Sequence, residues 1–205
     1  MKKILVALII VLTMGLDSNV SAALISFELK FAGSFDNPTV RLKNTSEATV
    51  QLTDFSMTIG DTSREFDMIT NPISDTDPGG DLTSTLVIGD SNQDLIGTDL
   101  YKFSFTGFNS NDLIRFYTEI DEDAQNTSED YRMVFFNNGE NENSVVTVSF
   151  FDGLNPGTLT MTLPDGDVAE SYVFIAEGQT VPIPGALWLF GSGLIGVIVL
   201  KKRKV

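Results

Sequence analysis

The side chains that could do chemistry in this chain are almost all carboxylates. The sequence has 28 aspartate and glutamate residues and 13 lysine and arginine residues, and it has neither histidine nor cysteine. Without imidazole or thiol groups, Ser–His–Asp and Cys–His catalysis and the usual zinc and copper ligand sets are excluded. Glycoside hydrolysis needs only two acids at a set separation, so a carboxylate-dependent glycosidase is the enzyme class that the composition permits. With so many acids some pairing arises by chance, and we expect a protein that is not an enzyme.

Calcium is the ligand best suited to acidic loops, because hard cations take carboxylate and carbonyl oxygens. The first candidate is the cluster of Asp121, Glu122 and Asp123, which Glu129 and Asp130 follow closely in the sequence. Further candidate loops contain Asp75, Asp77 and Asp81, or Asp165 and Asp167. None of these has the spacing of an EF-hand, and a solvated acidic loop gives the same pattern. Calcium is therefore a candidate ligand, and no other cofactor is expected.

The N-terminal segment has the features of a secretory signal peptide. Lys2 and Lys3 precede an apolar run over residues 4–12, and small residues follow before a cleavage site. Cleavage between Ala22 and Ala23 is the first choice, and cleavage one residue later is the alternative. An uncleaved membrane anchor disagrees with the short apolar run and with Asp17. We expect residues 1–22 to be removed after export through the Sec translocon and cleavage by signal peptidase.

The C-terminal segment predicts a membrane-spanning helix. No charged residue occurs from Gly185 to Leu200, and a basic cluster follows. Such a run can span a bilayer core of about 30 Å as a short helix. Pro182 and Pro184 lie where the helix would begin, and Trp188 would lie near the headgroups. The cluster Lys201, Lys202, Arg203 and Lys204 favours the cytoplasmic side, so the preceding chain is expected outside the cytoplasm.

The same residues closely resemble the PEP-CTERM sorting signal. Val181, Pro182 and Pro184 match its VPxP turn, with Ile183 where the commonest version has glutamate. The segment Trp188-Leu189-Phe190-Gly191-Ser192-Gly193-Leu194 matches its helix, and Lys201 to Lys204 match its basic end. The resemblance implies export, transient anchoring in the inner membrane of a Gram-negative bacterium, and cleavage near the proline turn by an exosortase. It also implies delivery to the cell surface or to the extracellular polysaccharide matrix. An ordinary C-terminal anchor is the alternative.

Residues 23–180 have the size of one domain and a strongly acidic composition. They contain seven basic and 27 acidic residues, a formal charge of −20. Such a surface repels nucleic acid and anionic polymers, and it would tolerate neutral polysaccharide or divalent cations. Nucleic acid is therefore not expected as a partner.

A period of two dominates residues 23–180 and predicts an all-β fold. Turn residues such as Asn-Pro, Pro-Gly and Asn-Gly separate short alternating runs, and about nine to eleven strands are expected. The predicted strands cover residues 25–31, 50–59 with a bulge or turn at Thr53-Asp54, 82–88, 100–108, 113–120, 131–136, 144–151, 158–163 and 171–176. This pattern favours a single jelly-roll-like β-sandwich, with a barrel as the alternative.

Three functions are consistent with these observations. The first is a non-catalytic surface or matrix protein associated with exopolysaccharide or biofilm. The second is a carbohydrate-binding module in that matrix, and the third is the secreted glycosidase. The chain has one tryptophan, Trp188 in the tail, so tyrosines would have to provide any sugar-stacking surface of the domain. The first function is favoured.

Overall fold

The computed structural model describes residues 22–33, 35–88, 98–122, 127–166 and 171–180. The compact unit runs from Ala23 to Thr180. The predicted signal peptide and the predicted sorting signal at residues 181–205 lie outside the described residues, apart from Ala22. Within the described part of the chain, no helix is both long and apolar enough to cross a membrane.

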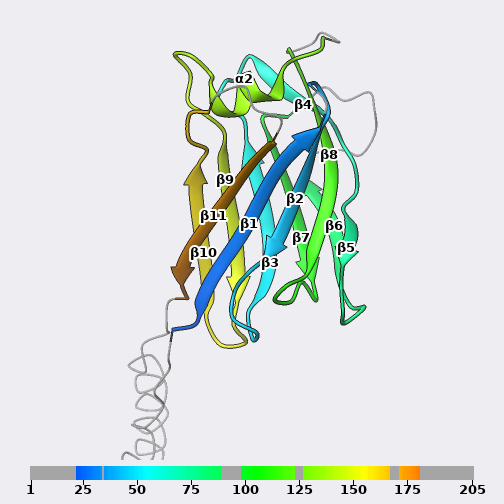
Figure 1. Ribbon diagram of the computed structural model, residues 1–205, viewed down its shortest axis with the longest axis vertical. Helices are drawn as coiled ribbons and strands as arrows, with labels where there is room; N and C mark the ends of the chain where they lie inside the picture. Colours follow the sequence, from blue (N-terminus) through cyan, green and yellow to red (C-terminus); the bar gives the residue numbers. More distant parts are fainter. Residues whose placement is uncertain (1–21, 34, 89–97, 123–126, 167–170, 181–205) are drawn as a thin grey trace, which may run out of the picture. The chain divides into compact units, whose positions relative to one another are not determined.

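Two antiparallel sheets pack face to face as a β-sandwich, which confirms the predicted fold class (Figure 1). In spatial order, sheet A contains β11 (Ser171–Gln179), β1 (Leu24–Gly33), β2 (Pro38–Asn44), β8 (Leu113–Glu122) and β4 (Arg64–Ile69), and β5 (Ile73–Thr76) also pairs with β8. Sheet B contains β10 (Pro156–Thr162), β9 (Val145–Phe151), β3 (Gln51–Thr58), β7 (Leu100–Thr106) and β6 (Thr83–Ile88).

The core lies between the sheets and follows from the alternation of apolar residues along each strand. In β1, for example, Phe27, Leu29 and Phe31 are fully buried, while Glu28 and Lys30 between them are only partly buried. Aromatic rings dominate this core: the ring of Phe116 lies 5.0 Å from that of Phe103, mostly edge-on. Such tilted and edge-on arrangements are the ones that aromatic pairs prefer.

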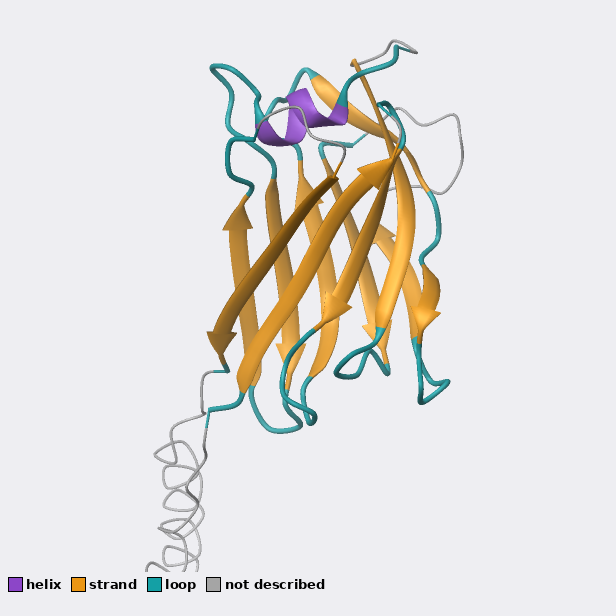
Figure 2. Ribbon diagram, in the orientation of Figure 1, coloured by secondary structure: helices purple, strands orange, loops and turns teal. Residues whose placement is uncertain are grey.

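One predicted strand is wrong: Tyr131–Phe136 forms the helix α2. Its buried residues include Tyr131, Val134 and Phe135, which have the i, i+3, i+4 spacing of one helical face. Asp130 provides the N-cap, because its side chain accepts a hydrogen bond from the Arg132 backbone N–H at 3.0 Å. The helix covers one end of the sandwich (Figure 2). The apolar run that suggested a strand is therefore the face of a short helix that closes the core.

Three strands, β2, β4 and β5, were absent from the sequence prediction. The pairing of β4 with β8 is irregular between Phe66 and Ile69, and all four residues of β5 are exposed. Strands β4 and β5 therefore lack a clear alternation of buried and exposed residues. The predicted irregularity at Thr53-Asp54 is confirmed, because the pairing of β3 with β9 shifts between Leu52 and Asp54.

Candidate functional site

The two ends of the sandwich domain are hydrogen-bonded to each other. The backbone N–H of Thr180 donates to the Ala23 carbonyl at 3.0 Å, and the Ala23 backbone nitrogen donates to Thr180 Oγ1 at 3.0 Å. Thr180 Oγ1 in turn donates to Asp152 Oδ2 at 3.0 Å. Both ends lie at the end of the sandwich opposite α2 (Figure 1). The two described ends of the compact unit are therefore side by side.

Of the first calcium candidate, Asp121 and Glu122 end strand β8, and Asp123 lies outside the described residues. Adjacent residues of a strand point to opposite faces, so the side chains of Asp121 and Glu122 diverge. Asp121 is 2% exposed, and Glu122 lies 3.6 Å from the guanidinium of Arg64. The carboxylates of Asp121 and Glu122 are therefore not placed to coordinate the same calcium ion.

Asp121 is nevertheless chemically unusual. Burial, together with the nearby carboxylates of Asp67, Glu119 and Glu65, raises its pKa to about 6, against a hydrogen bond from the Thr127 backbone that lowers it. Its Oδ1 atom is buried and has no hydrogen-bond partner in the described part of the chain. A raised pKa is what a general acid needs, but a side chain so thoroughly buried offers a substrate almost no access.

The acids of the second calcium candidate have three separate structural roles. Asp77 accepts hydrogen bonds from the backbone N–H groups of Gly80 at 2.8 Å and Leu82 at 3.1 Å, which closes the turn before β6. Asp75 pairs with Arg115 at 2.9 Å and with Arg41 at 3.9 Å. Asp81 accepts from the Asn109 side chain at 3.2 Å.

The remaining acidic candidates are also held by protein groups. Glu129 lies 3.4 Å from Arg64, and Asp130 caps α2 and pairs with Arg132 at 2.7 Å. Asp165 accepts from the Asn143 side chain at 2.9 Å, and Asp167 lies outside the described residues. Among the residues with described positions, no three acidic side chains are grouped so that they could hold a metal ion. Calcium binding stays a prediction without a defined site.

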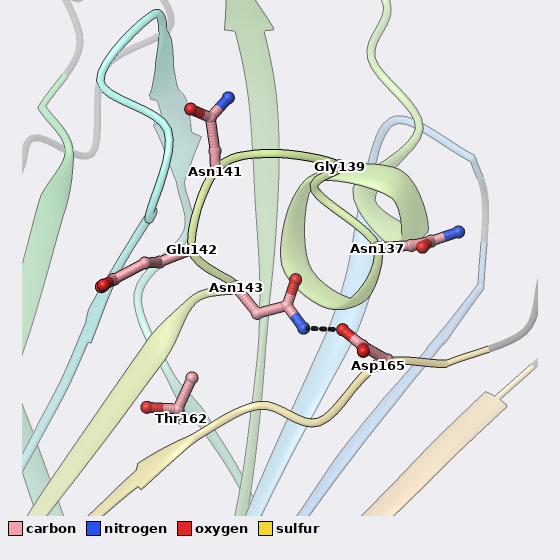
Figure 3. A pocket seen from close by; sticks show the side chains of 7 residues that line it. All are labelled: Asn137, Gly139, Asn141, Glu142, Asn143, Thr162 and Asp165. Carbon is pink, nitrogen blue, oxygen red and sulfur yellow. Dashed lines mark hydrogen bonds between the residues drawn. The ribbon is translucent and has the colours of Figure 1, made fainter.

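A polar pocket of about 500 Å³ lies beside α2 (Figure 3). It is lined by Asn137, Gly139, Asn141, Glu142, Asn143, Thr162 and Asp165. The Asn143 side chain organises it: its amide donates to Asp165 and to the Leu163 carbonyl, and its oxygen accepts from the Asn138 backbone N–H. Asn143 and Asp165 point toward each other, whereas Asn137, Asn141 and Glu142 point in different directions. Few polar groups are thus left to converge on one ligand.

The tyrosines do not form a sugar-stacking surface. Tyr101 and Tyr131 are buried in the core, at no more than 1% exposure. Tyr172 stacks on Phe136 with 4.1 Å between ring centroids, so that face of its ring is occupied. Tyr117 is partly exposed on the outer face of sheet A. A neutral-sugar platform would require several exposed rings, and of the four tyrosines, whose positions are all described, Tyr117 alone is neither buried in the core nor stacked on another ring.

Sheet A carries a feature that the sequence analysis missed. Four of the seven basic residues of the domain, Lys30, Arg41, Lys43 and Arg115, lie at outward positions of β1, β2 and β8. We call this surface the basic face. The other three basic residues each pair with an acid elsewhere: Arg64 with Glu122 and Glu129, Lys102 with Asp54, and Arg132 with Asp130. The alternation of β1 and of β8 in the sequence indicates which of their cations face outward, but the row also depends on β2 and on the order of the strands, which the sequence alone does not provide.

No protein-family model, curated protein or solved structure matches the chain. The two packed sheets place the chain in the class of β-sandwich proteins. Because no similar protein suggests a function, the function has to be argued from the features described above.

Proposed function

We propose that the chain is an exported, non-catalytic surface or extracellular-matrix protein of a Gram-negative bacterium. In this proposal, signal peptidase removes residues 1–22, the helix at residues 185–200 holds the protein transiently in the inner membrane, and an exosortase cleaves near Val181, Pro182 and Pro184. The observation that carries the proposal is the order of the tail elements: proline turn, WLFGSGL helix and basic end. The protein then reaches the cell surface or the polysaccharide matrix.

The geometry of the domain ends supports this route. Cleavage before Ala23 would leave a new amino group hydrogen-bonded to Thr180 Oγ1, beside the Asp152 carboxylate. Cleavage near the proline turn would follow Thr180 closely, and neither cut would remove a strand. Both cleavages are therefore compatible with an intact sandwich.

The same geometry supports a binding or structural role in preference to hydrolysis. Asp121, the described carboxyl with a pKa near 6, is buried, and the Asp165 carboxylate of the pocket beside α2 accepts a hydrogen bond from the Asn143 amide. Within the sandwich class we propose a jelly-roll-like arrangement, because β1, β2 and β3 each pair with a strand from the second half of the chain. The carbohydrate-binding alternative is favoured by the basic face.

The test uses an exosortase-bearing Gram-negative host and an otherwise identical strain that lacks the exosortase. We expect the protein in the medium or surface fraction of the first strain and in the inner membrane of the second. The variant Pro182→Ala/Pro184→Ala should remain in the membrane in both strains. Equal release from the two strains would contradict the proposal and would indicate another protease. Retention in the membrane of both strains would also contradict it and would indicate an ordinary anchor.

A further inference from the structure

The basic face is organised as a row across the strands of sheet A. In the strand register, Lys30 of β1 pairs with Arg41 of β2, and Arg41 pairs with Arg115 of β8. Neighbouring strands are about 4.8 Å apart, so the three positions span roughly 10 Å perpendicular to the strands. Lys43 lies in the next row, opposite Glu28. The three outward cations are thus directly adjacent on one surface.

Folding alone gives no reason for this row. Like charges directly opposite each other on a sheet destabilise it, and the domain has 27 acids beside which a cation would be favourable. Asp75 offsets part of the repulsion by pairing with Arg41 and Arg115. Among the described residues, no carboxylate lies within ion-pair distance of Lys30 or Lys43. The concentration of charge therefore indicates an anionic ligand.

The surroundings of the row indicate what kind of anion fits. A hollow of about 250 Å³ lies beside it, lined by Lys30, Arg41 and the small residues Ala32, Gly33 and Thr39. In the adjacent cross-strand row, Thr39 of β2 pairs with Tyr117 of β8. Exposed apolar side chains occupy both ends of the cation row: Val173, opposite Lys30, is 52% exposed, and Ile73, opposite Arg115, is 51% exposed.

We propose that the basic face binds an acidic polysaccharide whose sugars carry carboxylates. The arginine guanidinium groups match carboxylate oxygens, and the flanking apolar side chains and the Tyr117 ring suit the C–H faces of sugar rings. The net charge of −20 opposes every polyanion, and it opposes nucleic acid most, because a duplex carries two charges per 3.4 Å of its length. This inference deepens the proposed function by naming the polymer, and it replaces the expectation that anionic polymers are repelled.

The experiment measures binding of residues 23–180, the compact unit that contains both sheets and the described core. The probes are polygalacturonate, a neutral dextran and single-stranded DNA, each titrated at low salt and again at rising salt. We expect salt-sensitive binding to polygalacturonate and none to dextran. The domain is used without the tail, so a failure here is distinguishable from a failure of sorting.

Matched lysine variants locate the surface. Lys30→Gln and Lys102→Gln each remove one lysine charge from an outer face, and Lys102 lies on β7 of sheet B beside Asp54. Lys30→Gln should weaken polygalacturonate binding by about 1.4-fold to fivefold, the range for losing one exposed ion pair, and Lys102→Gln should not. Lys30→Gln/Lys43→Gln should weaken it further and reduce the salt dependence, with an unchanged circular dichroism spectrum.

Four results would overturn the proposal. They are the absence of polygalacturonate binding at low salt, equal effects of the two single lysine variants, tighter binding of DNA than of polygalacturonate, and a dimer in sedimentation that Lys30→Gln dissociates. The last result would show that the basic face contacts the acidic surface of a second copy.

Discussion

At the scale of single residues, the Asp121 carboxyl shows how burial and neighbouring charge set the chemistry of this acidic domain. It lies at the β4–β8 pairing, where Glu65 is its direct cross-strand partner. Burial is the main cause that disfavours ionisation of Asp121, and the nearby carboxylates, Asp67 first and Glu65 last, add to this effect. Glu119, on the same face of β8, has its pKa raised for the same reasons, burial first and then Asp67 and Asp36. This corner of sheet A is consequently less stable when its acids are ionised.

The predicted consequence is a pH-dependent gain of stability in Asp121→Asn. The pKa of Asp121 is about 6 in the folded protein against an ordinary value of 3.8, so the folded state holds the proton more tightly. Its contribution to stability is therefore lost as pH rises through this window. Asp121→Asn should be more stable than the parent at pH 7.5, by at most about 3 kcal/mol, and the difference should vanish near pH 4.

Urea unfolding of the domain at both pH values measures this difference. Glu47→Gln is the control, because it removes one acidic charge at an exposed position, and its effect should be small at both pH values. If the parent protein is more stable than Asp121→Asn at pH 7.5, the prediction is wrong, and a group other than the neighbours named above stabilises ionised Asp121.

At the scale of elements, the alternation of apolar residues predicted most of the strands, and the exceptions have physical causes. β1, β8 and β9 alternate cleanly because one face of each is buried in the core. α2 was mistaken for a strand because a six-residue helix has too few turns to show a period, and its cap at Asp130 is the signal that was available. The cross-strand row of the basic face could not be predicted, because it depends on the pairing of β2 with β8.

The short helix α2 should depend strongly on its N-cap. An isolated helix of six residues is unstable in water, so its capping and the burial of its apolar face must hold it. Asp130 caps the helix and also accepts two hydrogen bonds from the Arg132 guanidinium, each at 2.7 Å. Asp130→Ala should reduce the free energy of unfolding by about 1–2 kcal/mol, as for other N-cap replacements.

Asp130→Asn separates the cap from the ion pair. Asparagine caps a helix as well as aspartate does, so this variant should lose only the Arg132 pairing and less than about 1 kcal/mol. Urea unfolding followed by circular dichroism compares both variants with the parent. Equal losses for alanine and asparagine would show that the ion pair matters and the cap does not.

At the scale of the whole molecule, the domain has two distinct regions besides the end where Ala23 and Thr180 meet. Ala23 and Thr180 are joined at one end of the sandwich, and α2 with its polar pocket lies at the other (Figure 1). The outer face of sheet A carries the basic face along the side between them. The basic face therefore lies away from the end of the sandwich where Ala23 and Thr180 meet.

The proposed removal of both terminal signals during export can be tested by the intact mass of the protein. The protein is recovered from the envelope and from the medium of its native host and measured by mass spectrometry. We expect a released species that begins at Ala23 and ends near Pro182–Pro184. A released species whose mass extends to Val205 would contradict it, because the tail would then act as an anchor without exosortase processing.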